Sequence, residues 1–303
     1  MTLLTIGIPT YNRANYLGKL LAKIMPECER LGVEVLVSDN ASTDDTAGIA
    51  ARFSSIRYLR NPRNLGFDGN ILNLLDTAAG RFLWLLGDDD SLDVERLPEI
   101  VQLLKSSPST GLFFVSYRYD TSKKKGKVQL TSVTVGPQTY VDSYLHRATL
   151  ISTNIIDRQT YQQLSLDRQC VVKGWIHLHL LVLLAEKLRE SGGRITVVKD
   201  RIVIQGTFEG DYPIERYIQT FVDNFSFTLN HSPAPRLTLA KLKKHFYDIN
   251  VRLRLLNFKD IASQTKPEIF YAKAVKAFNF PWSGRLSFWL QYFLAKKLFR
   301  SRR

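Results

Sequence analysis

The sequence predicts an α/β fold in which a mostly parallel β-sheet is flanked by helices. Within the first 110 residues, segments with the apolar pattern of strands alternate with segments that carry a helical apolar face. The run from Phe82 to Leu86 is apolar at every position, as expected of a strand buried on both faces. Strand–helix alternation at this spacing is typical of βαβ units, whose strands pair in parallel.

The strands and helices of this first part can be placed from their apolar residues. The predicted strands cover residues 3–8, 33–37, 56–59 and 82–86. The predicted helices have their apolar faces at residues 16–24, from 44 onward, at 71–75 and from 92 to 104. The second helix is expected to begin at Asp44, with Thr43 as its N-cap and acidic residues in its first turn.

After residue 110 the alternation changes. We expect a strand over 112–119, a hairpin tip at 123–126, a returning strand over 127–135 and another strand over 152–156. Residues 175–188 are apolar and long enough for a buried helix, and short strands are expected at 195–198 and 202–205. From Tyr217 the pattern is helical, with an interruption at Ser232–Pro235. This Pro pair divides a predicted catalytic domain, residues 1–231, from a helical region, residues 232–303.

The chain of 303 residues has a net charge of +14 that is unevenly distributed. Residues 1–110 hold 11 Lys and Arg against 14 Asp and Glu, whereas the remainder holds 31 against 14. Between residues 285 and 303, aromatic and basic residues alternate, which fits a helix lying on an anionic membrane surface. A helix packed on the catalytic domain with a solvated basic edge explains the same pattern.

Several partners and locations are not expected. No apolar run approaches the roughly 18 residues of a membrane span, and Met1 leads into the first strand without the basic segment of a signal peptide. Two cysteines without metal-ligand spacing suit a reducing cytosol. No nucleic-acid recognition motif is present, so nucleic acid is not an expected partner. We therefore expect a cytoplasmic protein, which the basic segment could hold peripherally on an anionic membrane surface.

Three adjacent carboxylates, Asp88, Asp89 and Asp90, follow the apolar run. Neighbouring carboxylates repel one another unless a cation lies between them. Open α/β sheets bind ligands at the carboxyl ends of parallel strands, and hard oxygen ligands favour Mg²⁺ or Mn²⁺ shared with substrate phosphates. The alternative is a solvated turn in which one Asp caps the next helix.

Polar loops also follow the first three strands. Pro9–Arg13 is expected to end the first strand, because proline cannot donate to strand pairing. Asp39, at the end of the second strand, could accept hydrogen bonds from a base or ribose, although an Asx turn explains its neighbours without a ligand. In Asn61–Asn70, glycines permit close backbone approach, and polar side chains could reach a phosphate or sugar. The four loops are expected to converge at one edge of the sheet.

These loops, Pro-Thr-Tyr-Asn-Arg, Ser-Asp-Asn-Ala-Ser-Thr-Asp, Asn-Leu-Gly-Phe and Gly-Asp-Asp-Asp, resemble in their order the family 2 nucleotide-sugar glycosyltransferases, closely over residues 2–115 and loosely to about residue 210. The resemblance implies the A-type glycosyltransferase fold, a Rossmann-like mostly parallel sheet, with a nucleotide-diphospho-sugar donor and Mg²⁺ or Mn²⁺. Residues 1–115 would bind the donor and residues 116–231 the acceptor. Asp90 and Asp88 would hold the metal, with Gly87 where the family usually has an Asp. The donor would be bound by Pro9, Thr10, Tyr11, Arg13, Asp39, Asn40, Ser42, Asn64, Gly66, Asp68, Asn70, Asp88 and Asp89.

The Gly-Asp-Asp-Asp form, with Asn-Leu-Gly-Phe-Asp before it, is similar to a bacterial O-antigen and surface-polysaccharide subgroup that includes abequosyltransferases. This likeness implies transfer to a polyprenyl-diphosphate-linked glycan at the inner face of the cytoplasmic membrane. Three alternatives stay open, in descending order: the same fold acting on a soluble or protein acceptor, a non-catalytic sugar-nucleotide-binding protein, and a basic nucleic-acid-binding protein.

The resemblance also implies inversion of the anomeric centre by a general base. The family usually has an Asp near the start of a helix beyond the metal motif, but the corresponding segment here, Gly174–Leu180, contains no acid. His177 is the first candidate, because an imidazole titrates near working pH, and Trp175 beside it could stack on the acceptor sugar. Asp167, in the preceding loop, is the second candidate. A buried core histidine is the alternative reading of His177.

Overall fold

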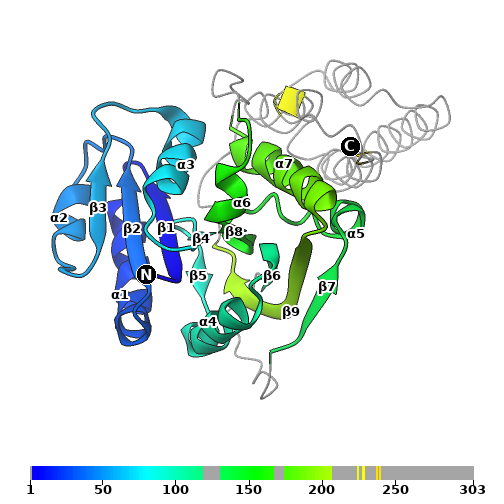
Figure 1. Ribbon diagram of the computed structural model, residues 1–303. Coiled ribbons are helices and arrows are strands. Elements are labelled where there is room, and N and C mark those ends of the chain that lie inside the picture. The colour runs from blue at the N-terminus through cyan, green and yellow to red at the C-terminus, as the bar shows by residue number, and fades with distance from the viewer. Residues whose placement is uncertain are drawn as a thin grey trace, which may run out of the picture.

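The computed structural model describes residues 2–118, 130–166 and 174–206, and the single positions 224, 227, 228, 237 and 239. These residues form one nine-stranded sheet with helices on both faces (Figure 1). The strands are β1 (Leu4–Thr10), β2 (Glu34–Asp39), β3 (Arg57–Arg60), β4 (Phe82–Leu85), β5 (Ser91–Leu92), β6 (Thr110–Arg118), β7 (Ser132–Val135), β8 (Asn154–Asp157) and β9 (Arg194–Ile204). The helices are α1 (Ala14–Leu31), α2 (Thr46–Ala50), α3 (Gly66–Thr77), α4 (Leu97–Ser106), α5 (Pro137–Ser143), α6 (Arg158–Gln162) and α7 (Ile176–Ser191), with 3-10 turns η1 (Val94–Arg96) and η2 (Ile151–Thr153).

The first four strands form the parallel half of the sheet, in the order β3-β2-β1-β4. β1 pairs in parallel with both β2 and β4, and β2 pairs in parallel with β3. A helix lies in each connection between consecutive strands of this half. The predicted alternation is therefore confirmed here, and the carboxyl ends of the four strands lie at one edge.

The other half of the sheet is mixed. β8 pairs antiparallel with β4 and with β6, and β9 runs parallel to β6. β5 and β7 both pair antiparallel with β9. Because β8 lies directly beside β4, the turn η2 that precedes it contacts the end of the parallel half. Segments far apart in the sequence therefore meet at the acidic triplet.

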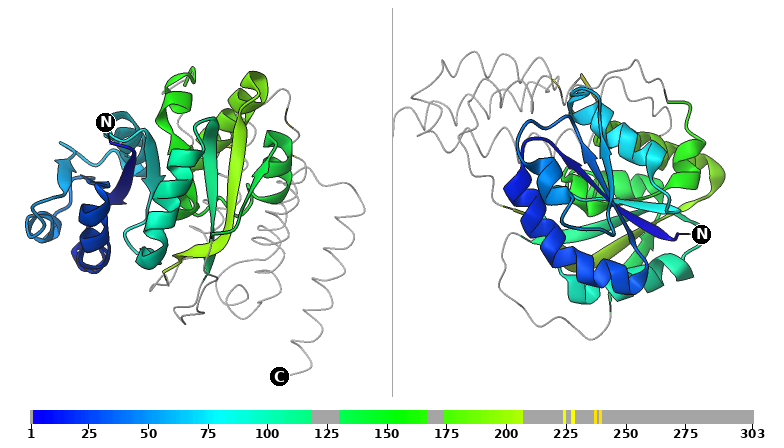
Figure 2. Two further views of the ribbon diagram at one scale, coloured as in Figure 1. Left: turned by 60° about the horizontal axis from the view of Figure 1, so that its bottom comes forward. Right: turned by 90° about the vertical axis from the view of Figure 1, so that its left-hand side faces the viewer.

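Two hydrophobic cores cover the two faces of the sheet. One face packs against α1 and α4, and the other packs against α3, α5 and α7. Figure 2 shows α1 and α3 on opposite sides of the first strands. The predicted apolar helix, α7, is buried over most of its surface, as its composition requires. Leu237 belongs to the same core as α7.

Pro9 does not end the first strand, contrary to our prediction. β1 continues to Thr10, and Pro9 is the partner of Ser38 in the register with β2. Leu86 N–H donates to the Gly7 carbonyl, so the backbone polar groups of Gly7 face β4. Because these groups alternate in direction along a strand, the backbone nitrogen of Pro9, two residues later, faces the same side. Since β4 ends at Leu85, the missing N–H of Pro9 costs no pairing.

Two helices begin later than predicted. α2 begins at Thr46 and not at Asp44, so Thr43 is not its N-cap. The Asp44 side chain instead accepts hydrogen bonds from the backbone N–H of Thr46 and of Ala14, the first residue of α1. Leu92 lies in β5, where it pairs with Val203, and α4 follows only after η1. In both places, long-range contacts determine a boundary that local pattern places too early.

The strand pairing of the second half also differs from prediction. β7 pairs with β9, and not with β6 as a hairpin would require. The two short strands expected at 195–198 and 202–205 are one strand, β9, whose register with β6 shifts around Lys199 and Asp200. This irregularity explains the break in the apolar pattern. The predicted hairpin tip at 123–126, Asp167 and most of the helical region after residue 217 lie outside the described residues.

Candidate active site

Asp88 and Asp90 lie just beyond the carboxyl end of β4 and are both buried, with 6% of each residue exposed. Thr10, at the end of β1, donates a hydrogen bond of 2.8 Å from Oγ1 to Asp88 Oδ2. Burial raises the pKa of Asp88 to about 6, although Arg13 and Thr10 act in the opposite direction. Burial likewise raises the pKa of Asp90 to about 6. The fold thus holds two carboxylates where ionisation is unfavourable unless a cation is near.

Arg13 supplies positive charge to the triplet from the loop after β1. Its Nε lies 2.8 Å from Asp88 Oδ1, and its Nη2 lies 2.8 Å from Asp89 Oδ2. The guanidinium also lies over the ring of Tyr16, with its central carbon 4.4 Å from the ring centroid. One guanidinium therefore joins two of the three carboxylates to the first loop.

The donor set of the triplet fits a hard divalent cation. Asp88 and Asp90 offer buried oxygen ligands, and burial raises the pKa of both carboxyls because it disfavours their charged forms. Among the described residues, no three or more His, Cys, Asp or Glu side chains form a complete metal site. This arrangement suits Mg²⁺ or Mn²⁺ bound through one or two carboxylates, with other ligands from a diphosphate and water.

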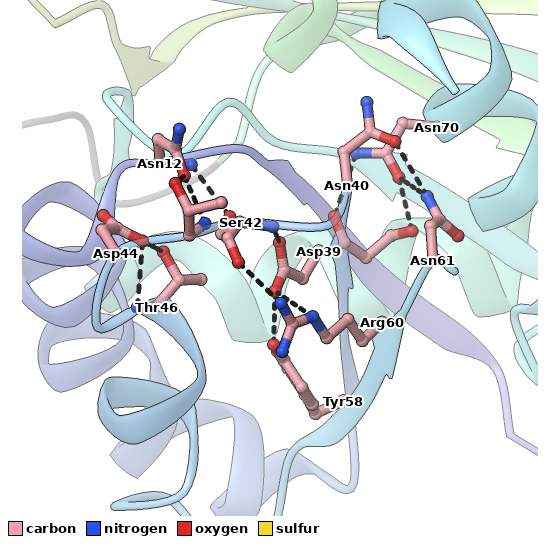
Figure 3. Close-up of polar contacts among 12 residues, drawn as sticks. Asn12, Asp39, Asn40, Ser42, Asp44, Thr46, Tyr58, Arg60, Asn61 and Asn70 are labelled. Carbon is pink, nitrogen blue, oxygen red and sulfur yellow. Dashed lines mark hydrogen bonds and ion pairs between the residues drawn. The ribbon is translucent and has the colours of Figure 1, made fainter. Parts of the chain in front are cut away.

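Asp39 lies at the end of β2 and is fully buried, with both oxygens bonded (Figure 3). Oδ1 accepts from Ser42 N–H at 2.8 Å, and Oδ2 accepts from the Tyr58 hydroxyl at 2.5 Å. Arg60 Nε lies 3.9 Å from the same Oδ2. Burial, followed by the Asp39 carboxylate, raises the pKa of Tyr58, so the hydroxyl keeps its proton and donates. Asp39 shapes its loop, and a bound base would share its oxygens with these groups.

The loops after β1 and β2 are fastened to each other. Asn12, whose φ of 53° lies in the left-handed region, accepts from Thr43 N–H at 2.7 Å through its side chain. Its own backbone N–H donates to Ser42 Oγ at 2.9 Å. These contacts hold Thr10 and the half-exposed Tyr11 beside the second loop. Asn12 is not among the predicted site residues, although left-handed Asn is common in such turns.

A network of buried asparagines holds the third loop in place (Figure 3). Asn70 is only 3% exposed, and its Oδ1 accepts from Ser38 Oγ at 2.6 Å and from Asn61 Nδ2 at 3.0 Å. Asn40 Nδ2 donates to Asn64 Oδ1 at 2.8 Å. The amides of Asn40 and Asn70 are therefore committed to protein partners. We conclude that they position this segment of the chain, whereas the sequence alone predicted that they contact the donor.

The loop predicted over Asn61–Asn70 is shorter than expected, because α3 begins at Gly66, and Asp68 in the first turn of α3 joins this helix to the start of α7. Its two oxygens accept from Gly174 N–H at 2.7 Å and from Ile176 N–H at 3.1 Å. Gly66, two residues earlier, has a φ of +71°, which glycine adopts without strain. Burial raises the pKa of Asp68, against the effect of the two N–H groups. Asp68 is thus an acid in contact with the start of α7, although it belongs to the first turn of α3.

His177 lies inside the protein, near the start of α7. The residue is 3% exposed, and its Nε2 donates to the Thr149 carbonyl at 2.9 Å. Its ring stacks on that of buried Trp175, with centroids 5.5 Å apart, and Phe67 packs against it edge-on. Burial lowers the pKa of His177 to about 4. This position argues against His177 as the general base, and the burial of Trp175 argues against stacking on an acceptor sugar.

Replacing Arg13 by glutamine is expected to destabilise the protein by about 1–2 kcal/mol at pH 8, because buried Asp88 would lose its ionic partner. Without Arg13 the pKa of Asp88 would rise further. The deficit should therefore be present above pH 6 and shrink as pH falls through about 6, where Asp88 becomes protonated. Urea unfolding at pH 8 and pH 5 measures this, with exposed Arg63→Gln as the control. An equal deficit at both pH values would contradict the account.

The sequence as a whole matches known proteins of one family. The model of "Glycosyl transferase family 2" matches residues 5–165. Abequosyltransferase RfbV of Salmonella typhimurium is 30% identical over 301 residues, which cover 91% of this chain and 85% of that protein. A Campylobacter jejuni protein named GalNAc(5)-diNAcBac-PP-undecaprenol beta-1,3-glucosyltransferase is 34% identical over 107 residues, or 34% of each chain.

Solved structures of similar fold support the same architecture. TarS of S. aureus, residues 1–349, superposes with a TM-score of 0.63 at 14% identity, covering 91% of this chain and 80% of that one. The mannosyltransferase PcManGT from Pyrobaculum calidifontis, in complex with GDP-Man and Mn²⁺, superposes with a TM-score of 0.58 at 16% identity, covering 97% and 86%. The predicted fold class is confirmed. Across the described part of the chain, none of the helices has the length and apolar character needed to cross a bilayer.

Proposed function

The chain belongs to glycosyl transferase family 2, and on that premise we propose a metal-assisted, inverting sugar transfer from a nucleotide-diphospho-sugar to a lipid-linked glycan of a bacterial surface polysaccharide. The observation that carries the proposal is the buried pair Asp88 and Asp90 at the carboxyl end of β4. Burial raises the pKa of both carboxyls, so the fold bears a cost that a bound cation would offset.

The residues of the proposed donor site have separate roles. Asp90 and Asp88 would hold Mg²⁺ or Mn²⁺, which neutralises charge on the leaving diphosphate when bound. The backbone and side chains around Thr10, Tyr11 and Asp39 would border the nucleotide, at the edge where parallel sheets bind such ligands. Arg13, 30% exposed at its side chain, can contact both the triplet and an incoming phosphate.

The metal and the donor class have support from proteins of similar fold. The mannosyltransferase PcManGT was solved with GDP-Man and Mn²⁺, and TarS was solved with UDP and with UDP-GlcNAc. Sequence identity to these proteins is 13–16%, so they inform the reaction class and not the identity of the base or sugar. We propose a nucleotide-diphospho-sugar as donor and leave the sugar to experiment.

The general base is best tested by paired substitutions. Because His177 is buried and bonded to Thr149, we now favour Asp167, an acid that precedes Gly174 by seven positions in the sequence. Asp167→Asn is expected to lower kcat by about 10²–10⁴-fold, as loss of a general base does, and His177→Gln by less than about tenfold. Steady-state kinetics with melting temperatures measures this. A reversed order of the two losses would return His177 to the role.

The proposed acceptor rests on relatives and on charge. RfbV is named an abequosyltransferase, and the Campylobacter relative has a polyprenol-linked substrate in its name. The basic aromatic segment at 285–303 would bring the enzyme to an anionic membrane surface, which makes it a peripheral membrane protein under this proposal.

The acceptor assay would use the full chain, labelled donors and a polyprenyl-diphosphate-linked glycan in vesicles that contain anionic lipid. The proposal predicts metal-dependent transfer of label into the solvent-extractable lipid fraction. Label in a water-soluble glycan or in protein would instead favour the alternative acceptors. Donor binding with no transfer to any of the three would favour a non-catalytic sugar-nucleotide-binding protein.

A further inference from the structure

We propose that Ser152 and Gly206, which lie outside all four loops of the family resemblance, position Asp90 for cation binding; this inference rests on the proposed function. Ser152 is 62 residues from Asp90 in the sequence, and Gly206 is 116 residues away. Both come from the second half of the sheet, in η2 and directly after β9. They are therefore positioning residues supplied by the predicted acceptor half to a carboxylate of the donor half.

The Ser152 hydroxyl has one proton, and its contacts direct that proton to Asp90. Gly87 N–H donates to Ser152 Oγ at 2.9 Å, so this oxygen already serves as an acceptor. The hydroxyl in turn donates to Asp90 Oδ2. Ser152 is itself fixed, because its carbonyl accepts from the indole N–H of Trp84 at 2.8 Å and the residue is fully buried. Oδ2 of Asp90 is thereby held by a series of hydrogen bonds that begins at Trp84 in β4 and passes through Ser152.

Gly206 holds the other oxygen of the same carboxylate. Its backbone N–H donates to Asp90 Oδ1 at 2.9 Å. The approach is so close that a Cβ on Gly206 would lie 1.9 Å from the carbonyl oxygen of Asp89, a distance that no side chain can adopt. The preceding residue is anchored by a hydrogen bond from Gln205 N–H to the Arg118 carbonyl at 2.8 Å. Glycine is therefore required here by contact with the triplet and not by its own backbone angles.

Asp90 and Asp88 are held in different ways. The Asp88 carboxylate has an ion pair with Arg13, whereas the hydrogen bonds to Asp90 come from two neutral groups. Neutral donors orient a carboxylate without cancelling its charge, and each oxygen keeps a lone pair for a cation. Groups that hydrogen-bond a metal ligand without touching the metal typically contribute about 10–100-fold to metal affinity.

The test measures Mn²⁺ binding to the metal-free full chain without donor, by the electron paramagnetic resonance signal of free Mn²⁺. Ser152→Ala and Gly206→Ala are compared with Asp90→Ala and with two matched controls. Ser116→Ala removes another buried hydroxyl, in β6, and Gly136→Ala adds a methyl group where no atom lies within 4 Å. Melting temperatures show whether each variant is folded.

The inference predicts that Ser152→Ala and Gly206→Ala each weaken Mn²⁺ binding by about 10–100-fold, while both controls bind as the parent does. If folded Ser152→Ala binds Mn²⁺ as tightly as the parent while Asp90→Ala does not, this inference is overturned. The proposed metal site would stand in that case. Asp90→Ala that binds Mn²⁺ as tightly as the parent would overturn the proposed metal site itself, and so would a parent chain that binds no Mn²⁺ even with a nucleoside diphosphate present.

Discussion

Asp90→Ala is expected to reduce the rate of sugar transfer by at least about 10²–10³-fold. A metal at a developing diphosphate contributes several kcal/mol of charge stabilisation, and each 1.4 kcal/mol corresponds to about tenfold in rate. Asp90 is buried and both its oxygens are oriented by fixed donors, so the substitution removes a carboxylate that is already in position to bind the metal. Steady-state kinetics at saturating Mn²⁺ measures the loss. A loss of less than tenfold would show that Asp90 is not a metal ligand in the reaction.

Asp90→Asn is the matched control for folding, because asparagine has nearly the same shape. Burial raises the folded-state pKa of Asp90 to about 6, above the value near 3.9 of an unfolded chain. The folded protein therefore binds the proton more tightly, and ionisation of Asp90 costs stability above pH 6. Without metal, Asp90→Asn should be at least as stable as the parent at pH 8, and this advantage should vanish as pH falls below about 4. An inactive but stable variant separates function from folding.

Trp84→Ala is expected to lower the free energy of unfolding by about 3–5 kcal/mol, the usual cost of removing a large core side chain. Trp84 is fully buried in β4, where it pairs with Ile6 of β1 and Ile155 of β8. The same change would remove the indole N–H that fixes Ser152, so Mn²⁺ affinity should also fall. Urea unfolding of the metal-free chain measures the first effect.

Trp84→Phe separates packing from hydrogen bonding. Phenylalanine keeps most of the buried ring but leaves the Ser152 carbonyl without its donor, which costs about 1–3 kcal/mol. We expect a smaller loss of stability than for Trp84→Ala, yet a clear loss of Mn²⁺ affinity. A loss of under about 1 kcal/mol for Trp84→Ala would contradict the placement of Trp84 as a fully buried core residue between β1 and β8.

Local pattern located the strands of the parallel half of the sheet, because β1, β2 and β4 carry buried apolar residues and a helix follows each of the first three strands. The partly exposed β3 was also located, although its outer residues are both Arg. The acidic triplet could also be located, since charged residues directly after a buried strand are unusual. Local pattern did not predict the strand partners in the second half, because pairing there joins segments that are distant in the sequence. β7 pairs with β9 and not with β6, and β9 continues through Lys199 and Asp200, which local pattern reads as a turn.

The candidate site was only partly predictable for the same reason. Ser152 and Gly206 carry no motif, and only the folded chain shows that they meet Asp90. Asn40 and Asn70 are committed to a protein network that no local pattern indicates. His177 lies in the core, which is the alternative that its apolar neighbours in the sequence already offered. Asp68, predicted to contact the donor, accepts hydrogen bonds from two N–H groups at the start of α7. The motif residues indicated where the site lies in the fold. Which of them bind a ligand and which hold the structure depends on contacts between segments that are distant in the sequence.

The central claim is that Asp88 and Asp90 bind a cation that assists departure of a nucleotide diphosphate. The most direct measurement is release of nucleotide from a panel of UDP-, GDP-, CDP- and dTDP-sugars, with donor binding measured in parallel. We predict that nucleotide is released from one donor, that EDTA stops this release, and that Mn²⁺ or Mg²⁺ restores it. Asp90→Ala should release no nucleotide with either metal. Turnover that persists in EDTA and in Asp90→Ala, or a panel with neither turnover nor metal-dependent donor binding, would contradict the account.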